Sequence, residues 1–424
     1  MTSAVAEPQT LAQKLIARAA GVSAVKPGEI VVCKVDMAMF HDSSGPRRLK
    51  PMLERLGASL WDKSRVVLVM DHYVPERDED SRRIVRIARD WAREQQLPHV
   101  YDSQGICHVV APQGGHVRPG TFCVGGDSHS CTGGAFGSYM FGIGATEMLG
   151  VVVTGEIWVK VPETIRIEWA GRLPAAVTAK DMMLKVIGEM GINGGRYQAM
   201  EYAGPAVRAL SMAERMTMSN MSAELGAQVG LIAPDNVTCD WLRSFGVESI
   251  EPGDWRSDED AASECHRHDA SALEPQVALP HSPANVQSIG VAKGASIDVA
   301  YIGACTGAKL EDMRAAAQVL RGRRVAAGVR LVLAPASLHD QGVARQEGTL
   351  QALQDAGAQL QASACGSCSG YGEPLDGVNV VSTTARNFRG RMGAASTQVF
   401  LGSPYTVAAS ALTGRLTDPR EVLA

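Results

Sequence analysis

The chain has 424 residues, of which 45% are hydrophobic, 20% charged and 5% aromatic, with 44 Gly and 20 Pro. This is the composition of a globular protein and excludes a disordered chain, a collagen and a coiled coil. At roughly 150 residues per domain, the length predicts two to four domains. The 41 Lys and Arg nearly balance the 45 Asp and Glu, and no long block of like charge suggests a nucleic-acid partner.

The first twenty residues lack the basic stretch, apolar core and small-residue cleavage site of a secretory signal. The longest apolar runs, such as Val66–Met70, are far shorter than the ~20 residues of a membrane-spanning helix. We therefore expect a cytoplasmic protein that binds neither a membrane nor nucleic acid. Nine cysteines in a chain of this length are expected to be reduced thiols, some of them metal ligands, rather than a disulfide framework.

Strand-like and helix-like segments alternate along the chain. Val66–Met70 is predicted to be a buried strand, and Ser81–Gln96, with apolar residues at helical spacing, the helix that follows it. The same order recurs at Val299–Ala304 and in a helix over 310–320. This alternation predicts an α/β architecture. The most polar interval, Glu251–Ser271, is expected to connect two domains.

Several reactive side chains follow predicted strands, which is where ligands bind in an open α/β sheet. They are Asp71 and His72, His108, the run Asp127, Ser128 and His129, and Cys305. A single histidine is more often a structural residue, so these positions alone do not define a site. Cys305 is expected to open the helix over 310–320, where the helix dipole would lower the pKa of its thiol.

A second cysteine signal is the pair Cys365 and Cys368, sixty residues after Cys305. Such a CxxC pair fits a redox couple, half of a zinc site or two packed cysteines, although the surrounding Gly and Ser are atypical of a thioredoxin-like motif. One distant and two paired cysteines also match a cubane iron–sulfur cluster that leaves one iron without a protein ligand.

Several strings together resemble the aconitase family. They are MDHYVP, GICH, GGDSHSCTGGAFGSYMFGIGATEM, YIGACTGAKLEDMR, CGSCSG and STTARNFRGRMG, in the family's order from about residue 32 to 403. Within the family, the chain is most similar to the large subunits of 3-isopropylmalate dehydratase and homoaconitase. The resemblance implies three α/β/α domains around a central 4Fe-4S cluster, without the family's swivel domain. We expect these domains at 1–125, 126–285 and 286–424.

The resemblance also implies roles for residues. The cluster ligands would be Cys305, Cys365 and Cys368. The acid–base and orienting pairs would be Asp71 with His72, His108 with Asp127, and His129 with Glu224. Substrate would be bound by Ser128, Asn220, Arg386 and Arg391, and Asn220 and Glu224 would project from one helical face. Without the resemblance, surface salt bridges would be the expected role of the two arginines. The other six cysteines have no assigned role: Cys33, Cys107, Cys123, Cys131, Cys239 and Cys265.

Three positions depart from the family pattern. Gly307 and Ala385 stand where relatives have Asn, and loss of these amides would change hydrogen bonding around the cluster. Val35 stands where relatives have a polar residue that touches substrate, which would suit a less polar substrate group.

The leading hypothesis is an iron–sulfur hydro-lyase that dehydrates, hydrates or isomerises a hydroxy di- or tricarboxylic acid such as a substituted malate. The alternatives are a simple hydratase of maleate or a methylated unsaturated diacid, a non-catalytic cluster-binding protein, and a zinc protein. In the family, a swivel domain completes the site with a serine base and an arginine. Because the chain ends roughly 30 residues after STTARNFRGRMG, we expect a separate small swivel-domain subunit as its partner.

Overall fold

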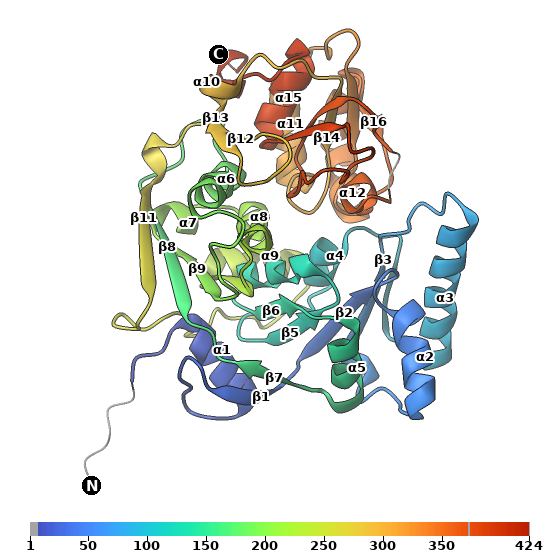
Figure 1. The fold of residues 1–424 in the computed structure, drawn as a ribbon, viewed down its shortest axis with the longest axis vertical. Helices are drawn as coiled ribbons and strands as arrows, with labels where there is room; N and C mark the ends of the chain where they lie inside the picture. The colour runs from blue at the N-terminus through green and yellow to red at the C-terminus, as the bar shows by residue number, and fades with distance from the viewer. Residues whose placement is uncertain (1–6, 372–373, 424) are drawn as a thin grey trace.

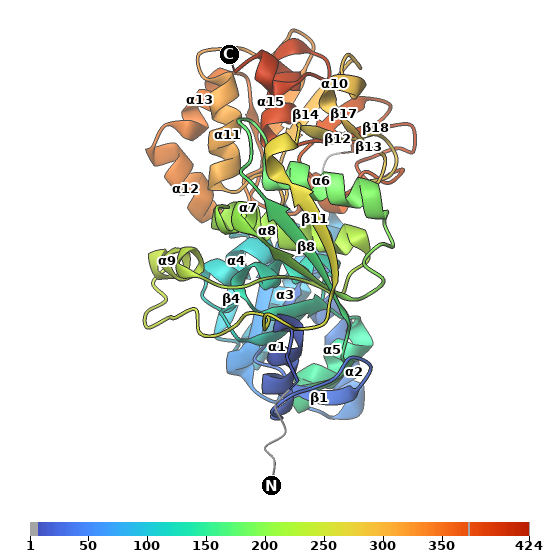
Figure 2. The ribbon, with the colours of Figure 1, turned by 90° about the vertical axis from the view of Figure 1, so that its left-hand side faces the viewer.

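The computed structural model describes residues 7–371 and 374–423. Their strands form three larger sheets and one two-stranded ribbon. The first sheet lies at the bottom of Figure 1 and the third at the top, with the second between them on the left. Figure 2 shows the same vertical order from the side. The α/β architecture predicted from the sequence is confirmed.

The first sheet has five parallel strands in the order β4-β3-β2-β5-β6. Successive side chains of a strand point to opposite faces. Ala38 and Phe40 of the central strand pack among apolar residues of α1, α2, α3 and α5, whereas Met37 and Met39 pack with α4 on the other face. Helices therefore cover both faces of this sheet. The bounds are β2 (Met37–His41), β3 (Val66–Met70), β4 (His99–Asp102), β5 (Phe122–Gly125), β6 (Tyr139–Gly142), α1 (Leu11–Ala20), α2 (Pro46–Leu56), α3 (Glu79–Gln95), α4 (Cys107–Gln113) and α5 (Ala145–Thr154).

The first predicted strand and helix are both present. Strand β3 has the predicted bounds, and all five of its residues are buried. Helix α3 begins two residues earlier than predicted, at Glu79, because Asp78 caps it by accepting a hydrogen bond from the Ser81 amide at 2.7 Å.

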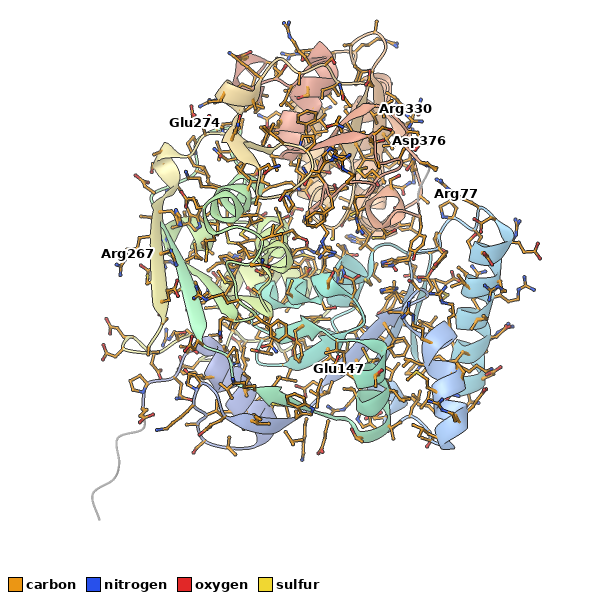
Figure 3. The ribbon with its side chains drawn as sticks, viewed as in Figure 1. Arg77, Glu147, Arg267, Glu274, Arg330 and Asp376 are labelled. Atoms are coloured by element: carbon orange, nitrogen blue, oxygen red, sulfur yellow. The ribbon has the colours of Figure 1, made fainter. Side chains whose placement is uncertain are left out.

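The second sheet has four parallel strands in the order β10-β9-β8-β11. Its elements are β8 (Thr164–Ala170), β9 (Ala199–Ala203), β10 (Val229–Ile232), β11 (Glu264–Asp269), α6 (Ala179–Met190), α7 (Pro205–Arg208), α8 (Met212–Asn220) and α9 (Asn236–Ser244). Strand β11 lies inside the interval that we expected to be a connection, so that interpretation is wrong for residues 264–269. These residues are polar because β11 is an exposed edge strand, from which Arg267 points outward in Figure 3.

The third sheet has seven strands in the order β13-β12-β18-β17-β14-β15-β16. The strand and helix predicted around residue 300 are β14 (Val299–Ile302) and α11 (Leu310–Leu320). The remaining elements are β12 (Gln276–Ala278), β13 (Val286–Ser288), β15 (Arg330–Leu333), β16 (Gln359–Leu360), β17 (Asn379–Ser382), β18 (Gln398–Leu401), α10 (Ile289–Ala292), α12 (Leu338–Gln346), α13 (Thr349–Asp355), α14 (Gly366–Ser369) and α15 (Pro404–Thr413). The separate ribbon pairs β1 (Ile30–Lys34) with β7 (Glu156–Lys160) in antiparallel register.

Strand pairing bears on where domains would divide. Strand β6 belongs to the first sheet although it follows residue 125, and β12 belongs to the third sheet although it precedes residue 285. Domain boundaries between residues 142 and 164 and between residues 269 and 276 would therefore follow the sheets more closely. The division of the chain into three domains stays a prediction. None of the described helices has the length and apolar character needed to cross a membrane.

Candidate active site

A cavity of about 380 Å³ lies between the first and third sheets. Its lining includes residues at or after the ends of β2, β3 and β5 and of β14 and β17, so the loops after these parallel strands form its walls. Ten of the residues singled out in the sequence line it: His72, His108, Asp127, Ser128, His129, Cys305, Cys365, Cys368, Arg386 and Arg391. The other three, Asp71, Asn220 and Glu224, are buried and hydrogen-bond to lining residues.

The three cysteines expected to bind metal reach the cavity from two loops. Cys305 lies between β14 and α11, and Cys365 and Cys368 flank the start of α14. A hydrogen bond from Cys365 lowers the pKa of Cys368 to about 5. Cys368 is therefore a thiolate at neutral pH, and the thiolate is the form that binds iron. Burial raises the pKa of Cys305 to about 12. The expected lowering by a helix dipole is therefore wrong, because Cys305 lies in a buried turn before α11.

This donor set fits a 4Fe-4S cluster with one open iron. The Asn220 Nδ2 donates to Cys305 Sγ at 3.1 Å, as expected beside a metal-binding thiolate. The Asn220 Oδ1 and Glu224 Oε2 atoms are buried and accept no hydrogen bond within the described chain, so both can accept one from a group in the cavity. No fourth cysteine is among the described lining residues. The six others are not among these lining residues: Cys33, Cys107, Cys123, Cys131, Cys239 and Cys265.

Asn220 and Glu224 do not share one regular helix, contrary to our expectation. Helix α8 ends at Asn220, and Glu224 lies in the following 3₁₀ turn, residues Met221–Leu225. Both side chains still reach the site, Asn220 through Cys305 and Glu224 through His129.

Asp71 and His72 follow β3 and form the first of the three predicted pairs. His72 Nδ1 donates to Asp71 Oδ1 at 2.7 Å, and Asp71 Oδ2 accepts from the Cys107 amide at 2.7 Å. Burial acts to lower the pKa of His72, but the neighbouring carboxylate outweighs it and raises that pKa to about 9. His72 is therefore a positively charged imidazolium at neutral pH, with a proton on both ring nitrogens.

Asp127 lies between two histidines. His108 Nε2 donates to Asp127 Oδ1 at 2.8 Å, and His129 Nδ1 lies 3.5 Å from the same oxygen. Burial acts to raise the pKa of Asp127, but hydrogen bonds from the two histidines outweigh it and hold that pKa well below its usual range. Asp127 is therefore a carboxylate at neutral pH, held in a fixed orientation.

His129, Glu224, Arg386 and Ser128 form one hydrogen-bonded chain. Glu224 Oε1 accepts from His129 Nε2 at 3.0 Å and from Arg386 Nε at 2.7 Å. Arg386 Nη2 donates to Ser128 Oγ at 3.0 Å. The two predicted carboxylate-binding residues thus lie together, with the guanidinium orientation set by Glu224. Arg391 lines the same cavity, and its Nε donates no hydrogen bond within the described residues.

One buried residue of the cavity, His41, was not identified from the sequence. It is the last residue of β2, and its ring stacks on His72 with 3.7 Å between centroids. His41 could have been singled out in the same way as the other strand-end residues, because the turn-forming run Asp42–Pro46 follows it directly.

The structure also accounts for the three departures from the family pattern. A Cβ atom on Gly307 would lie 2.1 Å from Thr383 Cβ, so this backbone packs too closely for a side chain. Ala385 is buried in an apolar cluster. Val35 packs in the core with α1 and does not line the cavity, so its expected effect on substrate choice is wrong.

Comparison with known proteins agrees with this arrangement. The model of the Aconitase family (aconitate hydratase) matches residues 13–414. The chain is 44% identical to 3-isopropylmalate dehydratase large subunit 1 of Methanopyrus kandleri, over 98% of this chain and 100% of the relative. It is 42% identical to a probable methanogen homoaconitase large subunit of Methanosarcina mazei, over 92% of this chain and 100% of that relative. The fold resembles that of Thermococcus kodakaraensis aconitase X, with a TM-score of 0.51 and 10% identity over 86% of this chain and 88% of that one. The chain therefore belongs to the aconitase family.

Proposed function

We propose that this chain is the large subunit of an iron–sulfur hydro-lyase that removes water from, or adds it to, a hydroxy di- or tricarboxylic acid. The observation that carries the proposal is one cavity lined by three thiols, two arginines of the expected carboxylate-binding set and three histidines, each hydrogen-bonded to a carboxylate. Membership of the aconitase family supports the reaction class.

Cys305, Cys365 and Cys368 would hold a 4Fe-4S cluster. When bound, such a cluster supplies a Lewis-acidic iron that polarises the C–O bond of a substrate hydroxyl. The Asn220 amide would orient the Cys305 sulfur, because it donates to that atom.

His72 is the proposed acid. Its Nδ1 is engaged by Asp71, so Nε2 is the atom that can donate a proton to the departing hydroxide. Its pKa of about 9 keeps that proton in place at neutral pH. Asp127 would orient His108 and His129 around the reacting group.

Ser128, Arg386 and Arg391 would bind a substrate carboxylate. The planar guanidinium presents parallel N–H groups that match two carboxylate oxygens. Glu224 fixes the orientation of Arg386, and Arg391 has an N–H group without a partner in the described chain.

A small swivel-domain subunit is the proposed partner. The dehydratase and homoaconitase relatives described above are both named large subunits, which supports a second polypeptide. We propose that this subunit closes the cavity and supplies the base that takes the carbon-bound proton.

An anaerobic screen tests the proposed function. The reconstituted chain, with a small subunit of the isopropylmalate dehydratase type, is incubated with a panel of malate and maleate derivatives. Interconversion of at least one malate with its unsaturated diacid supports a hydro-lyase. Stoichiometric zinc instead of iron, together with no product from any acid, would refute it.

A further inference from the structure

The segment His41–Arg48, which runs from the last residue of β2 into the first turn of α2, forms a wall of the cavity on the side of the first sheet. Four of its residues line the cavity: His41, Ser43, Ser44 and Arg48. Arg386 and Arg391 follow β17 and line the cavity on the side of the third sheet. The segment is therefore placed to contact the end of a ligand that these two arginines do not reach.

His41 is buried, with 3% of its surface exposed, yet neither of its ring nitrogens has a hydrogen-bond partner in the described chain. Its nearest carboxylate oxygens belong to Asp42, 3.8 Å from Nδ1, and Asp127, 3.9 Å from Nε2. Both distances exceed hydrogen-bonding range. Stacking on His72 holds the ring in place. Because an unpaired buried imidazole is unfavourable, we expect a ligand in the cavity to supply its partner.

The two nearby carboxylates do not oppose an anion there. Asp42 accepts three backbone hydrogen bonds, from Ser43 at 2.9 Å, His72 at 3.2 Å and Tyr73 at 2.8 Å. Asp127 is engaged by two histidines, as described above. Both negative charges are thus already compensated within the protein.

The rest of the wall offers hydrogen-bond donors. The Arg48 side chain is exposed and makes no hydrogen bond or ion pair with any described residue. The Ser44 Oγ is buried without a partner and packs over Gly126, where a Cβ would lie 2.6 Å from it. Gly45 is the N-cap of α2, an 11-residue helix, and makes no side-chain cap hydrogen bond, so the N-terminal end of the helix dipole adds to the positive potential.

We infer that His41, Ser44 and Arg48 form a second carboxylate subsite. This inference rests on the proposed function and deepens it: the subsite takes the carboxylate of a diacid that Arg386 and Arg391 do not hold. The described lining residues include three arginines against a single carboxylate, that of Asp127, which favours a ligand with two negative charges.

A matched pair of acids tests the subsite. Maleate has two carboxylates, and isocrotonate has the same carbon skeleton with a methyl group in place of one of them. Calorimetry measures the binding of each acid to the full chain, reconstituted without oxygen. Arg48→Ala should weaken maleate binding about tenfold and leave isocrotonate binding unchanged. His41→Phe, which keeps a ring stacked on His72 but removes both nitrogens, should do the same.

Arg47→Ala is the control, because Arg47 lies outside the cavity with its guanidinium over Tyr73 at 5.8 Å. It should bind both acids as the wild type does. If Arg48→Ala and His41→Phe both retain the wild-type preference for maleate, the subsite is wrong while the proposed function stands. A wild-type chain that binds neither acid would contradict the subsite and the proposed function together.

Discussion

Glu224 and Arg386 lie 162 positions apart and form an ion pair, with 2.7 Å between Glu224 Oε1 and Arg386 Nε. Glu224 follows α8, which packs beside the second sheet, and Arg386 follows β17 of the third, so the pair joins two walls of the cavity. The Glu224 side chain is fully buried. The carboxylate therefore fixes the plane of the guanidinium that faces the proposed substrate.

Arg386→Lys should raise KM about tenfold, although the positive charge is kept. An ammonium group is a point charge and cannot bond to Glu224, Ser128 and a substrate carboxylate with the same fixed geometry. Steady-state kinetics of the proposed two-subunit enzyme checks this, with Arg389→Lys as the control because Arg389 is an exposed residue of the same loop. An unchanged KM in Arg386→Lys would assign the residue to a structural salt bridge.

Replacing Cys305, Cys365 or Cys368 with Ser should abolish cluster binding. Two thiolates hold a cubane poorly, and the described lining contains no other cysteine. Anaerobic iron and sulfide analysis should find about four irons per wild-type chain and few in each variant. Cys265→Ser, at an exposed position of β11, should keep its full iron content. Full iron in any of the three cavity variants would remove that residue from the ligand set.

Turnover should fall as the pH rises through about 9. The paired carboxylate raises the pKa of His72 from 6.5 to about 9, so the acid form is present below that pH and is lost above it. His72→Gln should lower kcat by ~10²-fold or more while iron content is retained. His266→Gln, on the exposed edge strand β11, should change neither quantity. A wild-type profile that stays flat to pH 10, with normal turnover in His72→Gln, would exclude His72 as the acid.

Gly307→Ala should lower the free energy of unfolding by about 1–3 kcal/mol. The added Cβ would overlap the Thr383 side chain, whose Cβ lies 2.1 Å away. Denaturant unfolding measures the loss, and Gly150→Ala is the matched control. Gly150 lies within α5 with nothing within 4 Å of an added Cβ, so that change should be neutral or stabilising. Equal stability of Gly307→Ala and the wild type would mean that this backbone can move away from Thr383.

Much of the fold could be predicted because local sequence patterns determine where these strands and helices form. The buried strand 66–70 and the helix after it are set by apolar periodicity, and the helix start by Asp78. Strand β11 was missed because an exposed edge strand has polar residues throughout and looks like a connection. The pairings of sheets that bring residue 71 beside residue 365 depend on contacts that no local pattern encodes.

In the candidate site, too, local sequence patterns predicted some residues, whereas others depend on long-range contacts. Side chains at strand ends, such as Asp127 and Cys305, could be singled out from their positions. His41 was missed although a turn-forming run follows it, and its stacking against His72 is a long-range contact. The pKa of Cys305 was predicted with the wrong sign, because burial in a turn depends on the packing of three sheets and not on distance to the next helix.

The most direct test of the central claim is the ultraviolet absorbance of unsaturated diacid formed from the malate panel. The anaerobically reconstituted chain and its small subunit are assayed beside the same mixture prepared with Cys365→Ser. We predict product from at least one malate in the wild-type mixture and none in the variant mixture. If the wild-type complex, with its cluster and small subunit bound, forms no product from any malate, or if Cys365→Ser forms product at the wild-type rate, the account is contradicted.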